Sequence, residues 1–136
     1  MINYKYNDNV MDWYYVREEV FVKEQGFVNE FDELDGTSYH ITMYKDNELM
    51  GCGRYFKDND TYVIGRIALL KPFRGKGYSK LLIEEIERRI RLLGGTSAKL
   101  HAQCRAMPVY HKFGYQEYGE VEYDEHVEHM WMRKEF

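Results

Sequence analysis

The chain has 136 residues, a length that fits one ordinary domain with a buried core. Its formal net charge of -4 argues against a nucleic-acid partner, because phosphate contacts need clustered Lys and Arg. An apolar run such as Ile67–Leu70 is far shorter than the roughly 20 residues that span a bilayer, so we expect no membrane partner.

The N-terminal residues and the cysteines indicate the compartment. Met1–Lys5 lacks the apolar core of a signal peptide. The two cysteines, Cys52 and Cys104, lack the spacing of a disulfide framework or a structural zinc site. No repeat, low-complexity tract or linker interrupts the chain. We therefore expect a single cytoplasmic domain over residues 1–136.

The first half of the chain predicts one helix among strands. Residues 2–6 alternate apolar and polar side chains and could form a strand. Apolar residues from Val10 onward recur at helical spacing, and this helix should end near Gly26. Residues 39–44 and 49–56 then alternate again, which predicts two strands joined by a turn.

The middle of the chain predicts a parallel strand pair. Thr61–Leu70 is almost continuously apolar, which is typical of a central strand buried on both faces. The period then changes to 3.6, which predicts a helix over roughly Gly77–Leu93 with a solvated face of acid–base pairs. Lys99–Gln103 predicts the next strand. A strand–helix–strand unit of this kind is parallel with a right-handed crossover.

The remaining residues complete the fold class. Ala106–Phe113 predicts a short helix, and Tyr115–Val121 and Glu128–Arg133 predict two final strands. Short turns should make the other strand pairs antiparallel. The expected fold is α/β (α+β), with a mixed, mostly antiparallel sheet, one parallel βαβ pair and helices on both faces.

The turn between the central strand and the long helix carries the clearest functional signal. Gly75 and Gly77 allow a ligand close to the backbone, and the following helix N-terminus offers free N–H donors. Arg74 and Lys76 add positive charge. This combination suits a pyrophosphate, although a glycine-rich turn without a ligand is the simpler alternative.

Two nucleotide-binding motifs do not fit this turn. The Walker pattern needs glycine at the position of Leu70 and Ser or Thr at that of Gly77. The GxGxxG pattern fails because Lys80 replaces its third glycine, and no second βαβ half follows.

With these residues in view, the chain resembles the GNAT acetyltransferase superfamily. The phosphate-loop pattern of that family falls on Arg74, Gly77 and Ser79, where Ser79 replaces the usual Gly or Ala. A second family block, a polar amide at a strand end followed by a helix with an aromatic pair, falls on Gln103, Tyr110 and their neighbours. Residues of the N-terminal signature of the ElaA-like subgroup include Arg17, Val20–Val22, Glu24, Gln25, Asp35 and His40.

The resemblance implies acetyl-CoA as the acyl donor, bound where two strands separate, and no metal. The Leu69 N–H would polarise the thioester carbonyl and stabilise the oxyanion. Tyr110 would protonate the departing thiolate, or would only pack against the cofactor. The implied cofactor-binding residues are Ile67, Ala68, Leu69, Arg74, Gly75, Lys76, Gly77, Tyr78, Ser79, Gln103 and Tyr110.

The general base is harder to assign. Many GNAT relatives carry a Glu on the strand before the phosphate loop, but residues 63–66 hold no acid. Glu24 is the first candidate, with a pKa raised by burial or by neighbouring acids. His129 and His40 are alternatives with a suitable reference pKa. Glu24–Asp35 is an acidic loop without Lys or Arg, so it is either solvated or attracts a cationic amine.

The other reactive side chains have structural interpretations. His126 and His129 lie three apart on an expected strand, so they should point to opposite faces and bind no metal. Cys104 belongs to no Cys–His–acid set, which favours a small buried thiol over an acyl-enzyme intermediate.

Two functions remain open on the sequence alone. The first is an N-acetyltransferase in which a primary amine attacks acetyl-CoA directly through a tetrahedral intermediate. The second is a non-catalytic module that senses acyl-CoA. The amine acceptor is unidentified, and the chain is expected to be a monomer or a homodimer.

Overall fold

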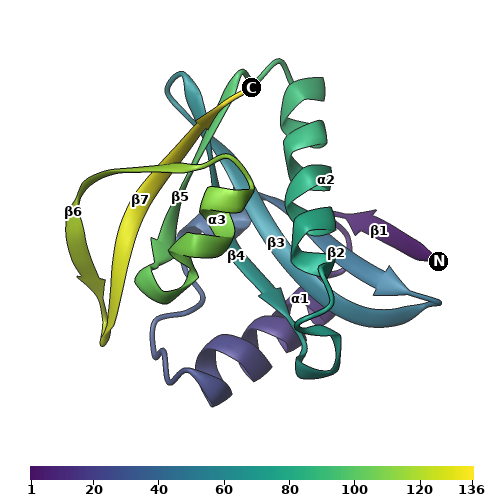
Figure 1. Ribbon diagram of the computed structural model, residues 1–136. Helices are drawn as coiled ribbons and strands as arrows, with labels where there is room; N and C mark the ends of the chain where they lie inside the picture. The colour runs from purple at the N-terminus through teal and green to yellow at the C-terminus, as the bar shows by residue number, and fades with distance from the viewer.

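A computed structural model describes residues 1–136 as one seven-stranded sheet flanked by helices (Figure 1). Five neighbouring strand pairs are antiparallel, and the β4–β5 pair is parallel. In spatial order the strands are β1 (Ile2–Tyr6), β2 (Tyr39–Lys45), β3 (Glu48–Asp58), β4 (Thr61–Leu69), β5 (Ser97–Gln103), β7 (Val127–Glu135) and β6 (Gln116–Asp124). The expected mixed sheet with one parallel βαβ pair is confirmed.

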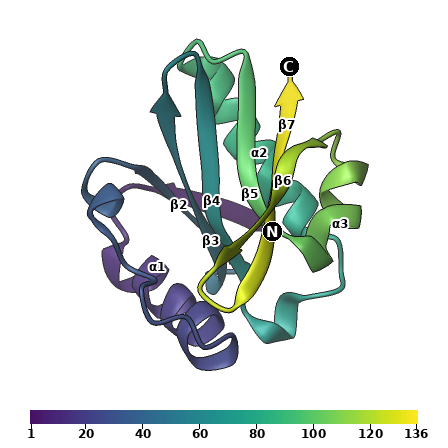
Figure 2. The same cartoon turned by 90° about the vertical axis from the view of Figure 1, so that its left-hand side faces the viewer.

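Helices cover both faces of the sheet, as the sequence predicted. Figure 2 shows α1 on one side of the sheet and α2 and α3 on the other. The bounds are α1 (Val10–Arg17), α2 (Tyr78–Leu92) and α3 (Met107–Lys112), and α1 continues directly as the π-helical segment η1 (Glu18–Glu24). Short 3-10 turns are η2 (Glu33–Gly36), η3 (Lys71–Phe73) and η4 (Cys104–Ala106). No helix is both long and apolar enough to cross a bilayer.

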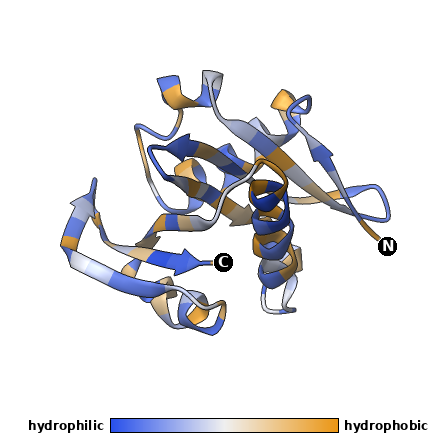
Figure 3. Ribbon diagram, turned by 90° about the horizontal axis from the view of Figure 1, so that it is seen from above, coloured by the Kyte–Doolittle hydropathy of each residue, from blue (hydrophilic) through white to orange (hydrophobic).

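Two apolar clusters hold these layers together. On one face α2 buries four side chains spaced along a single stripe, Leu82, Ile83, Ile86 and Ile90, against the sheet. On the other face α1 and η1 bury a smaller cluster that includes Trp13, Val16, Val20 and Phe21. Full burial of each such side chain contributes about 1.5–3 kcal/mol. The amphipathic character of α2 is visible in Figure 3, where orange and blue residues alternate along the helix.

The polar face of α2 differs from the expected row of solvated pairs. Glu87 is buried, and its carboxylate accepts hydrogen bonds from Lys134 Nζ at 3.0 Å and from the Tyr115 hydroxyl at 2.7 Å. Glu85 pairs with Arg88, three residues on, instead of with Arg89. The sequence missed the Glu87 contacts because both partners come from distant parts of the chain.

The ends of several helices and strands differ by a few residues from those predicted from the sequence. The long helix begins at Tyr78, because Gly77 has a left-handed φ of 82° and only caps it. The last two strands are longer than expected and form a hairpin that extends from the sheet. His126 falls in the turn of that hairpin, so the expectation that it lies on a strand with His129 is wrong.

Candidate active site

The sheet opens between its two parallel strands. β4 and β5 pair over only three positions, from Tyr62 opposite Ala98 to Ile64 opposite Leu100. Beyond Ile64 the rest of β4 has no partner on this side, while β5 stays paired with β7 as far as Gln103. The expected separation of the two strands at their C-terminal ends is therefore confirmed.

A bulge in β4 accompanies this separation. Cys52 on β3 faces Ala68, and Arg54 faces Gly65, yet β3 has one residue between these positions and β4 has two. Arg66, within the bulge, has a left-handed φ of 54°. A bulge bends its strand and increases the local twist, which turns the end of β4 away from β5.

The bend leaves backbone groups of β4 facing the gap. Leu70 donates its N–H to Met50 on the β3 side at 2.7 Å. Successive residues of a strand direct their N–H groups to opposite sides, so the Leu69 N–H points into the gap, and that of Ile67 has the same direction. Ala68, between them, is buried against the α1 cluster.

A cleft of about 630 Å³ occupies the opening. Its walls come from β4, β5, β7, α3 and the loop that follows η1. Among the residues that line it are Gln25, Phe27, Arg66, Ile67, His101, Gln103, Tyr110, Asp124, His129 and Trp131. Of the residues expected to bind a cofactor, the cleft thus brings together Ile67, Gln103 and Tyr110.

The glycine-rich turn lies outside this cleft, at the N-terminus of α2. Gly75 and Gly77 have φ values of 74° and 82°, and a Cβ added to either would meet no atom within 4 Å. Glycine is required there by the backbone conformation, and the surface beside the turn is open. Lys76 is exposed, and Tyr78 and Ser79, half-buried, begin the helix whose first N–H groups have no partner within it.

Glu24 pairs with Arg74 beside the glycine-rich turn and does not line the cleft. Its two carboxylate oxygens accept hydrogen bonds from Arg74 Nη1 and Nη2 at 2.8 and 2.9 Å. This hydrogen bonding holds the pKa of Glu24 below its ordinary value. The expectation that the pKa of Glu24 is raised for a general base is therefore wrong. Arg74 also donates from Nε to the Leu69 carbonyl at 2.9 Å.

Tyr110 lies on α3 beside the gap. Its ring makes edge contacts with Phe113 and Tyr115, at centroid distances of 6.1 Å each, and its hydroxyl has no hydrogen-bond partner in the chain. Burial raises the pKa of Tyr110 to about 12. The phenol therefore stays protonated at neutral pH and is able to donate a proton or a hydrogen bond into the cleft.

Gln103 ends β5 at the edge of the cleft. Its Nε2 donates to the Gln25 side-chain oxygen at 2.7 Å, and its Oε1 accepts from Arg105 Nε at 2.9 Å. The amide thus connects the end of η1 with the start of η4. This contact orients Gln25, which the sequence had placed only in the N-terminal signature.

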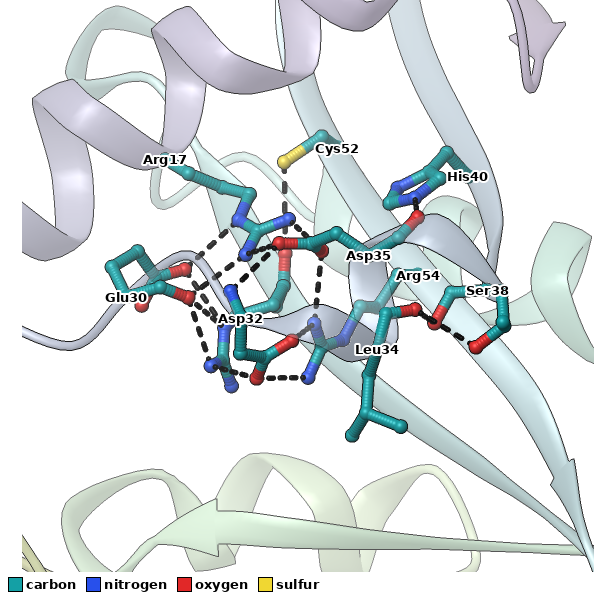
Figure 4. Close-up of polar contacts among 11 residues, drawn as sticks. Arg17, Glu30, Asp32, Leu34, Asp35, Ser38, His40, Cys52 and Arg54 are labelled. Carbon is teal, nitrogen blue, oxygen red and sulfur yellow. Dashed lines mark hydrogen bonds and ion pairs between the residues drawn. The ribbon is translucent and has the colours of Figure 1, made fainter.

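A network of charged side chains forms another wall of the cleft (Figure 4). Three arginines and three carboxylates from α1, β3, β4 and the acidic loop are joined by hydrogen bonds. The members are Arg17, Arg54, Arg66, Glu30, Asp32 and Asp35. The formal charges of the six side chains cancel.

Arg17 joins two of the three carboxylates of this network. It is 1% exposed, and it donates from Nε to Glu30 at 2.9 Å and from Nη1 to Asp35 at 2.6 Å. Burial acts to raise the pKa of Asp35, but hydrogen bonds and charge from Arg17 and Arg54 outweigh it and lower the pKa to about 2. For Glu30, burial dominates and raises the pKa. Four of the five acids in the loop 24–35 are thus ion-paired with arginines, and the exposed Glu33 is the exception.

An aromatic row lines the β5–β7 wall. His101 stacks on Trp131 with ring centroids 4.6 Å apart and lies 4.9 Å from His129, which contacts Phe27. Burial, and then the neighbouring His129, lowers the pKa of His101. The sequence assigned no role to His101, and only the cross-strand register brings the two imidazoles together.

The other residues singled out from the sequence have structural contacts. His40 is buried, stacks on Trp13 at 4.2 Å and places Nε2 2.8 Å from the Asp35 carbonyl. His126 contacts the Gln25 carbonyl through Nε2 at 2.6 Å. Cys52 and Cys104 are both free thiols. No three His, Cys, Asp or Glu residues are grouped so as to hold a metal ion.

Comparison with known proteins places this geometry in context. The family model described as an acetyltransferase (GNAT) domain matches residues 5–136. The sequence is 35% identical over 134 residues to YjcF of Bacillus subtilis, named an uncharacterized N-acetyltransferase, with 96% of each chain covered.

Solved structures agree with the fold. The crystal structure of Escherichia coli ElaA superposes with a TM-score of 0.86 at 26% identity, covering 99% of this chain and 100% of that one. A Bacillus subtilis acetyltransferase in complex with CoA superposes with a TM-score of 0.79 at 15% identity, covering 100% and 99% of the two chains.

Proposed function

Because the chain belongs to the GNAT acetyltransferase family, we propose that it transfers the acetyl group of acetyl-CoA to a primary amine. The observation that carries this proposal is the gap between β4 and β5, which presents unpaired backbone groups of β4 beside Tyr110. A cleft of about 630 Å³ opens at this gap and has room for an acceptor.

Donor binding would use two parts of the chain. The pyrophosphate would lie on the N–H groups of Gly75–Ser79, where the positive end of the α2 dipole and Lys76 favour an anion. The pantetheine arm would run along β4 and hydrogen-bond the free backbone of Ile67 and Leu69, as an added strand does. Gln103 would contact the arm from the opposite strand.

Acetyl transfer would then need three groups in place. The neutral amine nitrogen attacks the thioester carbonyl carbon, and the Leu69 N–H stabilises the developing oxyanion. The carbon–sulfur bond breaks, and the departing thiolate takes the proton of the Tyr110 hydroxyl. A base must remove a proton from the acceptor ammonium before attack.

The donor site is tested by thermal unfolding. Acetyl-CoA at about 100 times its dissociation constant should stabilise the protein by ~2.7 kcal/mol, which raises the melting temperature by roughly 10 °C. Arg74→Ala combined with Gly77→Val should remove this rise, because valine is strained at the left-handed φ of Gly77 and the loop cation is lost.

Gly36→Ala is the matched control, since Gly36 has open space around its Cβ position and lies outside the loop. The control should keep the full response. A full response from the Arg74/Gly77 double variant would show that the phosphate loop has been assigned to the wrong residues.

A further inference from the structure

His129 lies at the point where the sheet opens. It is paired with Gln103, the last residue of β5, and it is 6% exposed while lining the cleft. Its ring packs near Phe27, which belongs to the apolar cluster on the α1 side. Tyr110 instead packs against the cluster on the α2 side. The two side chains thus approach the same cleft from opposite faces of the sheet.

One hydrogen bond determines which nitrogen of His129 is free. Nδ1 lies 2.9 Å from the Val127 carbonyl oxygen. A carbonyl oxygen only accepts hydrogen bonds, so Nδ1 carries the hydrogen and donates it. In the neutral ring Nε2 then keeps its lone pair, and it has no hydrogen-bond partner within the chain. An oriented neutral imidazole of this kind is a proton acceptor.

The titratable groups nearest His129 come from β5, β6 and the hairpin turn. His101 on β5 lies on one side at 4.9 Å and is held toward its neutral form, because burial lowers its pKa. Glu122 on β6 is the cross-strand partner of His129 and lies 3.4 Å from His101 Nε2. Asp124 and Glu125, near the hairpin turn, also line the cleft. Arg66 and Arg105 line the same cleft, and neither is hydrogen-bonded to His129.

The other candidate bases already have hydrogen-bond partners within the chain. Glu24 is held by both terminal nitrogens of Arg74, and His40 is packed against Trp13 with Nε2 at the Asp35 carbonyl. Glu125, the exposed acid at the cleft edge, accepts the backbone N–H groups of Val28 and Asn29 at 2.9 Å each.

We propose that His129 is the general base of the reaction and that its Nε2 takes a proton from the acceptor ammonium, directly or through one water. This assignment rests on the proposed acetyl transfer. The ammonium proton passes to His129 and then to solvent. The freed amine attacks the carbonyl carbon, the carbon–sulfur bond breaks, and Tyr110 protonates the thiolate. After the attack the amine nitrogen still carries one surplus proton, and this proton restores the Tyr110 hydroxyl. The net release is therefore one proton per turnover, the proton that His129 passed to solvent.

The test is the pH dependence of kcat/KM for amine-dependent CoA release. His129→Asn is the informative variant, because its Nδ2–H occupies the place of Nδ1 and can keep the hydrogen bond to the Val127 carbonyl. It should lower kcat/KM at neutral pH by about 10²–10⁴ and remove the acidic limb of the profile. The melting-temperature rise with acetyl-CoA should not change.

Two variants are matched controls. Glu24→Gln tests the acid that pairs with Arg74, and His126→Gln tests the other histidine of the same hairpin. Both should keep the acidic limb. Imidazole added to His129→Ala should restore part of the rate, which a purely structural role would not produce. The assignment is overturned if His129→Asn keeps the acidic limb, or if Glu24→Gln loses it. A wild-type protein that releases no CoA with any amine would instead overturn the proposed function, and the assignment with it.

Discussion

Replacing Tyr110 with phenylalanine is expected to lower turnover by about 10²–10⁴ while leaving the affinity for acetyl-CoA nearly unchanged. The substitution keeps the ring and its edge contacts with Phe113 and Tyr115, and it removes only the hydroxyl. Because burial raises the pKa of Tyr110 to about 12, the hydroxyl holds its proton until the thiolate forms. The measurement is kcat for amine-dependent CoA release, with donor affinity from calorimetry.

Tyr115→Phe is the matched control for this result. The Tyr115 hydroxyl is buried and donates to Glu87 at 2.7 Å, away from the cleft. Its loss should cost stability of about 1.5–3 kcal/mol, as for a hydrogen bond to a charged group, and should leave kcat within a few-fold. If Tyr110→Phe turns over as fast as this control, Tyr110 only packs against the donor.

Arg17→Met is expected to lower the free energy of unfolding by about 3–5 kcal/mol. Methionine has a similar length but leaves Glu30 and Asp35 without their shared partner, and Glu30 is only 5% exposed. Removing one partner from a buried ion pair costs more than the pair contributes, because the remaining charge stays desolvated. Urea denaturation measures the change.

The control for Arg17 lies one turn and a half farther along the same helical segment. Lys23 pairs with Glu19 at 2.8 Å, but its side chain is 59% exposed. Lys23→Met should change the free energy of unfolding by no more than ~0.5 kcal/mol. Equal effects of the two substitutions would show that the buried network does not stabilise the fold.

The fold was predictable because the local periodicity of apolar residues indicates most of its helices and strands. The apolar stripe of α2 is visible in the sequence and is matched by burial in the structure. The alternation over residues 39–44 predicted the strand β2 but not its burial, because His40–Tyr44 are buried on both faces of the sheet. The parallel β4–β5 pair followed from chain order and connection length. Element ends were less predictable, since they depend on single residues such as Gly77, whose φ is set by the folded loop.

The site was only partly predictable, for a different reason. The glycine-rich turn is local, so the sequence predicted its two glycines at a strand-to-helix turn, and both have left-handed φ values. The pairing of Glu24 with Arg74 joins residues 50 apart, and the contact of His101 with His129 depends on β5–β7 register. Likewise, the acidic loop gave no sign that three arginines from α1, β3 and β4 neutralise it. Charge pattern alone does not identify such long-range partners.

Acceptor-dependent release of the CoA thiol tests the central proposal most directly. Purified protein would be incubated with acetyl-CoA and a panel of primary amines, with thiol release and the acetylated amine followed together. We expect at least one amine to release CoA in equal amount to its N-acetyl product, and Tyr110→Phe to abolish most of both. If acetyl-CoA raises the melting temperature but no amine in a broad panel is acetylated, the result would contradict the enzyme and favour a module that only senses acyl-CoA.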